Sequence, residues 1–167
     1  MIKAYSASIT LTNHILERLL KLALIKDELK LERINFEKWN ETYTADKFEE
    51  INNSTMFDTI KKCHERKLID DEEKEHLTYI RQSIRNGFSH YTPKAILKDN
   101  YDTKTFTLRD RNHNEIKKIE MNYKDIPIFQ SHYIDQFTRE HALEYFDYVF
   151  VLINSIKNNL MIKHRSC

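Results

Sequence analysis

The segment SIRNGFSHYTP, residues 83–93, gathers side chains that can act together on a phosphate group. Arg85, Asn86 and His90 lie within six positions, around the only glycine of the chain, Gly87. A free histidine titrates near pH 6.5 and can exchange a proton at neutral pH, whereas an arginine stays charged and can hold phosphate oxygens as negative charge develops. These residue types favour phosphodiester cleavage through the 2′-hydroxyl of RNA. That chemistry requires no metal ion or cofactor, and we expect none.

The motif is expected near the end of a helix that starts after Asp70. Asp70 and Glu73 have the spacing of a capping box, and Pro93 disfavours a helix that continues beyond about Tyr91. On a helical wheel, one stripe about 80° wide contains four apolar residues, Leu77, Ile80, Ile84 and Phe88. We expect this stripe to pack on the core of the domain.

The same wheel places the motif on the opposite arc, at about 100° from Ile84 for Arg85, 140° for Ser89, 200° for Asn86 and 240° for His90. We therefore expect this face to meet a substrate or a partner. Asn86 and His90 are four residues apart, so Asn86 can orient the imidazole. If two such helices met across a two-fold axis, each would supply an arginine and a histidine to one cleft. Gly87 would then permit close backbone approach, at a cost of about 1 kcal/mol relative to alanine.

The string RNGFSH, residues 85–90, resembles the Arg-x4-His signature of the HEPN superfamily. These small helical bundles occur in toxin–antitoxin systems, abortive-infection proteins and RNA-targeting CRISPR effectors. The family favours a polar residue, often asparagine, directly after the arginine, and Asn86 supplies it. ERKLIDDEE before the motif helix, and a turn and a final helix after it, also resemble the family context. The resemblance covers about residues 45–91 and 138–160.

The resemblance implies a mainly α fold, a HEPN-like bundle of four to five helices in a single domain over residues 1–167. It also implies a metal-independent endoribonuclease that acts as a homodimer, with Arg85 and His90 catalytic and Asn86 supporting them. The products would carry 2′,3′-cyclic phosphate ends. The protein would act as a toxin or antiviral effector, with an antitoxin or another defence-system protein as a candidate partner. Some members have a modified tyrosine two positions after the histidine, where this chain has Thr92.

Two other interpretations remain open. A non-catalytic HEPN module could bind a nucleotide or a partner protein through the same face. Alternatively, Arg85 and His90 could be cations that favour the negative end of a helix dipole, with Gly87 relaxing the chain before Pro93.

Other residues are weaker candidates for a site. Arg81, one turn before Arg85, is the best placed to contact RNA phosphates, and Ser89 and Tyr91 are further candidates. Three histidines, His14, His64 and His76, are isolated on expected helices, so we expect each to be solvated or hydrogen-bonded rather than a metal ligand.

The composition fits one helical domain. Of 167 residues, 32% are charged and 40% apolar, with one glycine and two prolines, which disfavours turn-rich sandwiches and barrels. A net charge of +1 creates no global field that would attract duplex DNA, so any nucleic-acid contact must be local. Cys63 and Cys167 lack metal-site spacing, and no run of about 18 apolar residues occurs. We expect a soluble, cytoplasmic protein with reduced thiols.

Hydrophobic periodicity predicts four helices and one insertion. The helices are expected over residues 8–39, 46–67 and 70–91, and from a cap at Thr138 onward. The expected buried positions include Ile15 and Leu22 in the first helix and Phe57 in the second. In the last helix they form a stripe, namely Leu143, Phe146, Phe150, Ile153 and Leu160, widened by Tyr145, Tyr148 and Val149. The insertion, about residues 94–135, is expected to form either a β-hairpin of TFTLRD and EIKKIEM, with Phe106 and Leu108 on one face, or an irregular loop.

Overall fold

The computed structural model describes residues 4–32, 36–38, 40, 46–89, 103–109, 115–122 and 127–165. These residues form a mainly helical structure, which confirms the expected class. None of the helices in these ranges is both long enough and apolar enough to cross a membrane.

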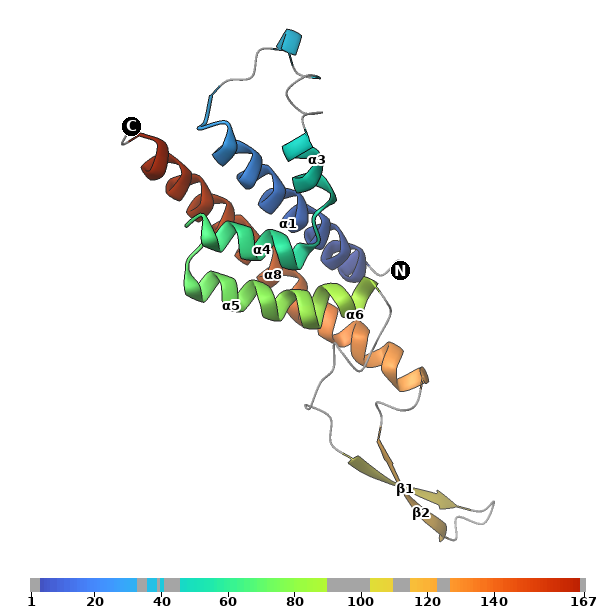
Figure 1. The fold of residues 1–167 in the computed structure, drawn as a ribbon. Coiled ribbons are helices and arrows are strands. Elements are labelled where there is room, and N and C mark those ends of the chain that lie inside the picture. The colour runs from blue at the N-terminus through green and yellow to red at the C-terminus, as the bar shows by residue number, and fades with distance from the viewer. Residues whose placement is uncertain are drawn as a thin grey trace.

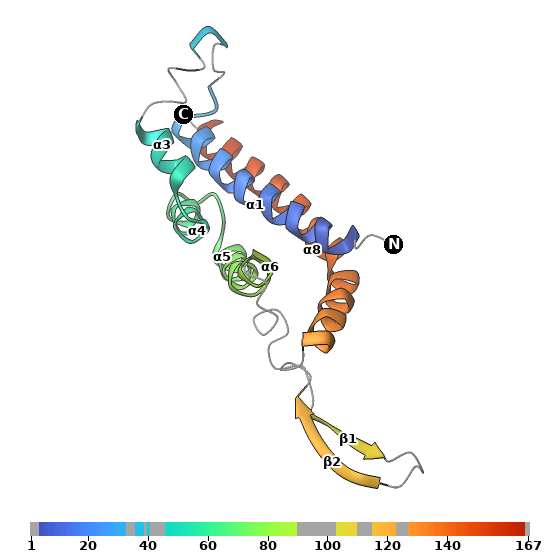
Figure 2. The same cartoon turned by 90° about the vertical axis from the view of Figure 1, so that its right-hand side faces the viewer.

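Two long helices form the spine of the molecule. α1 (Ala4–Glu28) and α8 (Pro127–Arg165) lie side by side and run in the same direction (Figures 1 and 2). Their parallel alignment follows from two contacts far apart along them, between Asn13 and Tyr145 and between Asp27 and His164. α3 (Asp46–Asn53) lies beside α1, and a short 3₁₀ turn, η1, covers Phe36–Lys38.

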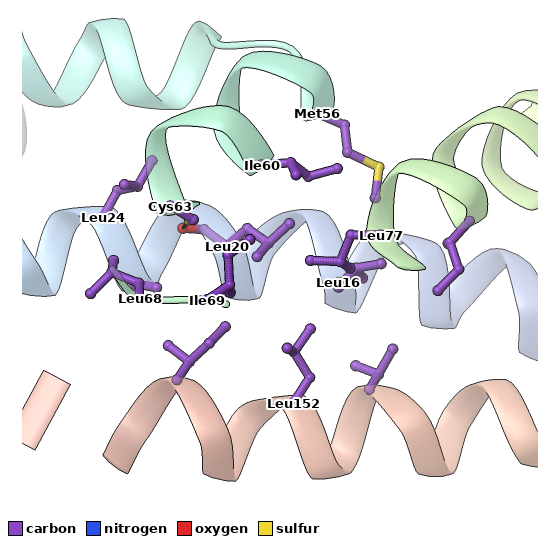
Figure 3. Packing of buried hydrophobic residues seen from close by; sticks show 14 of the residues in the cluster. Leu16, Leu20, Leu24, Met56, Ile60, Cys63, Leu68, Ile69, Leu77 and Leu152 are labelled. Atoms are coloured by element: carbon purple, nitrogen blue, oxygen red, sulfur yellow. Dashed lines mark hydrogen bonds between the residues drawn. The ribbon is translucent and has the colours of Figure 1, made fainter. Parts of the chain in front are cut away.

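The motif belongs to a second group of helices, which packs on one side of this pair. The group contains α4 (Met56–Glu65), α5 (Asp71–Ile80), the π-helical turn η2 (Arg81–Arg85) and α6 (Asn86–Ser89) (Figure 2). The core lies between the two groups, where Leu16 and Leu20 of α1 approach Leu77 of α5 and Leu152 of α8 (Figure 3). This core therefore fixes the motif segment against both long helices.

The start of the motif helix confirms the capping-box prediction. The Glu73 amide donates to the Asp70 side chain over 2.8 Å, and the Asp70 amide donates to the Glu73 carboxylate over 3.0 Å. The two contacts satisfy amides that the helix itself leaves unpaired.

The first two predicted helices have different bounds in the structure. α1 ends at Glu28 rather than near residue 39, because Lys30 and Leu31 adopt left-handed backbone angles with φ of 47° and 63°. The predicted helix over residues 46–67 is two helices, α3 and α4, separated by residues 54 and 55. The break occurs because Thr55 caps α4, its hydroxyl accepting the Asp58 amide over 3.2 Å.

The last helix differs most from its prediction. α8 begins at Pro127, a residue type that suits the first helical position, rather than after a cap at Thr138. Thr138 is buried inside the helix, where its hydroxyl donates to the Asp135 carbonyl over 2.9 Å. Residues 127–135 are therefore helical and do not belong to the insertion.

The predicted core stripe of α8 is wrong in part: Leu160 is buried, and so are Tyr145 and Val149, which were expected to widen the stripe. Leu143, Phe146, Phe150 and Ile153 are exposed, and the buried stripe consists of Ile134, Thr138, Ala142, Tyr145, Val149, Leu152, Ile156 and Leu160. Three more residues expected in the core, Ile15, Leu22 and Phe57, are exposed as well. Both α8 stripes have helical periodicity, so the pattern alone could not identify the one that faces the core.

The β-hairpin alternative for the insertion is confirmed. β1 (Thr103–Arg109) pairs antiparallel with β2 (Glu115–Asn122), with Phe106 opposite Ile119 and an irregularity between Leu108 and Arg109. The prediction that Phe106 and Leu108 share a face concerns side chains outside the described part of the chain. The hairpin stands away from the helices in Figure 2.

Candidate functional site

The motif lies on a locally widened helix. The Asn86 amide donates to the Arg81 carbonyl, five residues back, which makes residues 81–85 a π-helical turn. Such turns are rare, and they occur frequently at functional sites. Leu77, Ile80 and Ile84 are buried and Phe88 packs partly against the core, which confirms the predicted stripe.

Arg85 is held in place by two side chains. Its Nε donates to Glu17 Oε1 over 2.8 Å, and its Nη1 donates to Asn86 Oδ1 over 3.2 Å. The Arg85 side chain is 32% exposed and that of Glu17 is 28% exposed, so the pair is partly shielded from water. The wheel predicted that Arg85 projects freely from the motif helix. In the structure, its side chain instead contacts Glu17 of α1. The wheel assumed 100° per residue, and the π-helical turn departs from that spacing.

Asn86 supports Arg85 through the hydrogen bond from Arg85 Nη1 to Asn86 Oδ1. Within the described part of the chain, this is the one side-chain contact of Asn86. The predicted contact between Asn86 and His90 lies outside the described residues, as do His90, Tyr91 and the Ser89 side chain. Of the predicted catalytic pair, Arg85 and His90, the described residues thus include Arg85 alone.

A small hollow opens beside this arginine. Its lining comes from one face of α1 and from the motif segment, namely Thr10, Asn13, His14, Glu17, Arg85 and Phe88. The sequence interpretation set His14 aside as isolated and did not consider Glu17. One feature of the sequence could have identified the α1 side of this hollow. Four polar residues are spaced so that they lie on one side of a helix, namely Thr10, Asn13, His14 and Glu17.

Gly87 is buried and has no left-handed backbone angle. Gly87 is therefore not required here by a backbone angle that other residues disfavour. Its burial inside a helical segment indicates that the absence of a side chain lets the motif backbone approach its neighbours closely. The structure shows Gly87 buried within one chain, whereas close approach to a second copy stays a prediction.

Arg81 lies apart from the hollow. Its guanidinium carbon is 5.0 Å from the centre of the Phe57 ring, a cation–π contact with an exposed aromatic residue. The Arg81 Nε is buried and has no hydrogen-bond partner among the described atoms. Its predicted role at RNA phosphates therefore stays a prediction.

Three other titratable side chains, those of His64, His76 and Cys63, either contact neighbouring residues or are buried. His64 Nε2 lies 2.8 Å from Asp71 Oδ1, and the His76 ring packs against the Tyr148 ring with centroids 4.3 Å apart and the planes tilted by 48°. Burial raises the pKa of the Cys63 thiol to about 12, which makes it a poor nucleophile. Within the described ranges, no three His, Cys, Asp or Glu side chains cluster as metal ligands do.

Comparison with known proteins identifies no relative. The chain matches no protein-family model, no curated protein sequence and no solved structure.

Proposed function

We propose that this protein is a metal-independent endoribonuclease, in which Arg85 holds the scissile phosphate and His90 exchanges the proton of the 2′-hydroxyl reaction. The observation that supports this proposal is the anchoring of Arg85. Glu17 and Asn86 occupy one N–H donor each, and among the described residues the remaining donors of the guanidinium have no partner, which leaves them for a phosphate at the hollow. An arginine oriented in this way can stabilise negative charge that develops on phosphate oxygens.

The proposed site is composite. A second copy of the chain would supply its own Arg85 and His90, as the resemblance of RNGFSH to the HEPN signature implies. RNA is the proposed substrate, and a toxin or antiviral effector is the proposed role, with an antitoxin or other defence-system protein as a candidate partner. Growth arrest on expression of the wild-type chain, and normal growth with Arg85→Ala, would support that role.

The Glu17 carboxylate favours a second candidate function. Its negative charge next to Arg85 weakens the attraction of the guanidinium for a phosphate. A non-catalytic HEPN module that binds a partner protein through the same surface would tolerate that charge, whereas one that binds a nucleotide would meet the same repulsion at its phosphate. Such a module would not depend on a histidine that titrates near neutral pH, whereas the ribonuclease would.

The two functions can be separated with a fluorescent RNA substrate in buffer containing EDTA. We expect the wild type to cleave it, and Arg85→Ala and His90→Ala each to lose about 100-fold or more in rate. Arg139→Ala is the matched control, because Arg139 is an exposed arginine paired with Asp135 on α8. Cleavage that requires a metal ion, or that survives both substitutions, would contradict the ribonuclease proposal. RNA or nucleotide binding without cleavage would favour the second candidate.

A further inference from the structure

The hollow beside Arg85 contains a histidine, His14 of α1, which has no role in the proposed function. His14 is exposed, and it lines the hollow together with Arg85. Each of the other described histidines contacts a carboxylate or an aromatic ring, namely His64, His76, His132, His141 and His164. Within the same described ranges, His14 contacts neither, so its imidazole remains for a ligand.

The charges of the hollow cancel unless His14 is protonated. Arg85 carries one positive charge, and Glu17 Oε1, 2.8 Å from Arg85 Nε, carries one negative charge. The other residues that line the hollow are uncharged, and the described lining includes none from α8. Arg18 follows His14 by one turn of α1 and lies outside this lining. A neutral His14 therefore leaves the hollow without net charge, whereas a protonated one gives it a net positive charge.

His14 lies close enough to Arg85 for the two to share one ligand. Glu17, which contacts Arg85, is three residues after His14, so the Cβ atoms of Glu17 and His14 are about 5–6 Å apart on one side of α1. Asn13 Oδ1 accepts from the Tyr145 hydroxyl over 2.7 Å, which leaves the NH2 group of Asn13 as its donor at the hollow. The hollow has a volume of about 80 Å³, well below the roughly 300–1,000 Å³ of pockets that enclose a whole small ligand. It therefore suits a single group of phosphate size.

We infer that protonated His14 is a second phosphate ligand in this hollow and binds one phosphodiester together with Arg85. The inference rests on the proposed function for the identity of the ligand, a phosphate of RNA. It also explains how a phosphate can bind next to Glu17, because His14 restores the positive charge that Glu17 cancels. Since the protonated form binds, the contribution of His14 is present below the pKa of the imidazole and is lost as pH rises through it.

The test is an NMR titration of the full chain with a 2′-deoxy dinucleotide, at about pH 5.5 and about pH 7.5, the limits between which most histidines titrate. The dinucleotide has one phosphodiester, which keeps a single negative charge at both pH values, and it lacks the 2′-hydroxyl that cleavage requires. We expect the wild type to bind about 10-fold more tightly at the lower pH, which corresponds to one charge-assisted hydrogen bond. The titration midpoint of the His14 ring signals should move to higher pH when the dinucleotide is bound.

Three variants separate His14 from other causes of pH dependence. His14→Gln should bind about 10-fold more weakly than the wild type at the lower pH and about equally at the higher pH. The matched control is His64→Gln, which removes a histidine that contacts Asp71 outside the hollow, and it should bind like the wild type. Glu17→Gln keeps an oxygen for Arg85 Nε but removes the negative charge, so it should bind about 5-fold more tightly than the wild type at the higher pH.

Circular dichroism melts would establish that each variant is folded. The same pH dependence in wild type and His14→Gln, an equal loss in His64→Gln, an unmoved His14 midpoint, or no binding at either pH would overturn the inference. RNA cleavage in EDTA is measured separately. Binding that depends on His14 without any cleavage would contradict the ribonuclease proposal alone. Cleavage by the wild type, together with binding that His14→Gln leaves unchanged, would contradict the role of His14 alone.

Discussion

Glu17 and Asn86 give Arg85 a fixed orientation that a solvent-exposed arginine lacks. An arginine side chain has about 2 kcal/mol of rotamer entropy to lose when it is held in one geometry. With Nε on Glu17 and Nη1 on Asn86, part of that loss occurs on folding. A phosphate that binds at the hollow would then meet a guanidinium that is already oriented.

A buried hydrogen bond joins single side chains of α8 and α1, and it leads to a prediction about stability. The Tyr145 hydroxyl donates to Asn13 Oδ1 over 2.7 Å, and both residues are buried. Tyr145→Phe leaves this acceptor without its donor, so we expect the free energy of unfolding to fall by about 1–3 kcal/mol in urea titrations.

Tyr148→Phe is the control for this change. The Tyr148 hydroxyl is buried, on the same helix, and has no hydrogen-bond partner among the described atoms. Its removal should change the free energy of unfolding by less than about 0.5 kcal/mol, or raise it. Equal losses in the two variants would show that the hydrogen bond to Asn13 does not explain the effect.

The sequence was sufficient to find part of the candidate site. Arg85 and Asn86 were recognisable because they are adjacent in one motif. Glu17 lies 68 residues away, so its contact with Arg85 depends on how α1 packs against the motif segment. The π-helical turn also escaped prediction, because a wheel with constant spacing cannot represent a widened turn.

At the scale of elements, α4 ends in a Schellman-like turn without a glycine. The Leu68 amide donates to the Cys63 carbonyl over 2.9 Å, and the Lys67 amide donates to the His64 carbonyl over 2.9 Å. Lys67 is exposed and has φ of 61°, a left-handed angle that disfavours residues with a Cβ atom.

We therefore expect Lys67→Gly to stabilise the protein by about 1 kcal/mol, seen as a higher midpoint of thermal or urea unfolding. Lys67→Ala removes the same charge but keeps the Cβ atom, so it should give no gain. A stabilisation by alanine equal to that by glycine would show that charge, rather than backbone geometry, is responsible.

The start of the motif helix was easier to predict than the buried face of α8. The Asp70–Glu73 capping box depends on residues three positions apart, and it forms as the spacing indicates. The buried face of α8 depends on contacts with α1 and α5, which are distant in sequence. Two apolar stripes with the same period compete on that helix, and the more aromatic one is the exposed one.

At the scale of the whole molecule, Asp27 joins three distant segments. This buried carboxylate at the end of α1 lies 2.7 Å from Lys163 Nζ and 2.8 Å from His164 Nε2 on α8, and 3.5 Å from Arg66 Nη1 after α4. Burial by itself raises the pKa of Asp27, but the hydrogen bonds from Lys163 and His164 and the nearby positive charges outweigh it. The pKa is therefore held below its ordinary value of 3.8.

This lowered pKa predicts loss of stability in acid. A carboxylate whose pKa is lower in the folded state stabilises the fold above its ordinary pKa, and that contribution disappears as pH falls through the folded value. We expect Asp27→Asn to be less stable than wild type at pH 7 and the two curves to converge in acid, as pH falls below 3.8 and through the lowered pKa of folded Asp27, in urea titrations across pH. A constant difference between the two proteins at all pH values would contradict this role of the Asp27 charge.

The mainly helical class followed from composition, and short local patterns offered the hairpin as one of two alternatives. The pairing of α1 with α8, and the surface that they leave exposed, depend on tertiary packing that no local pattern contains.

The most direct test of the central claim is the chemistry of the RNA ends. RNA would be incubated with the wild-type chain in EDTA, and the products analysed by mass spectrometry. We expect 2′,3′-cyclic phosphate and 5′-hydroxyl ends from the wild type, and no such products from Arg85→Ala or from a 2′-deoxy strand of the same sequence. Products with 5′-phosphate ends, or the same cyclic products from Arg85→Ala, would contradict the proposal.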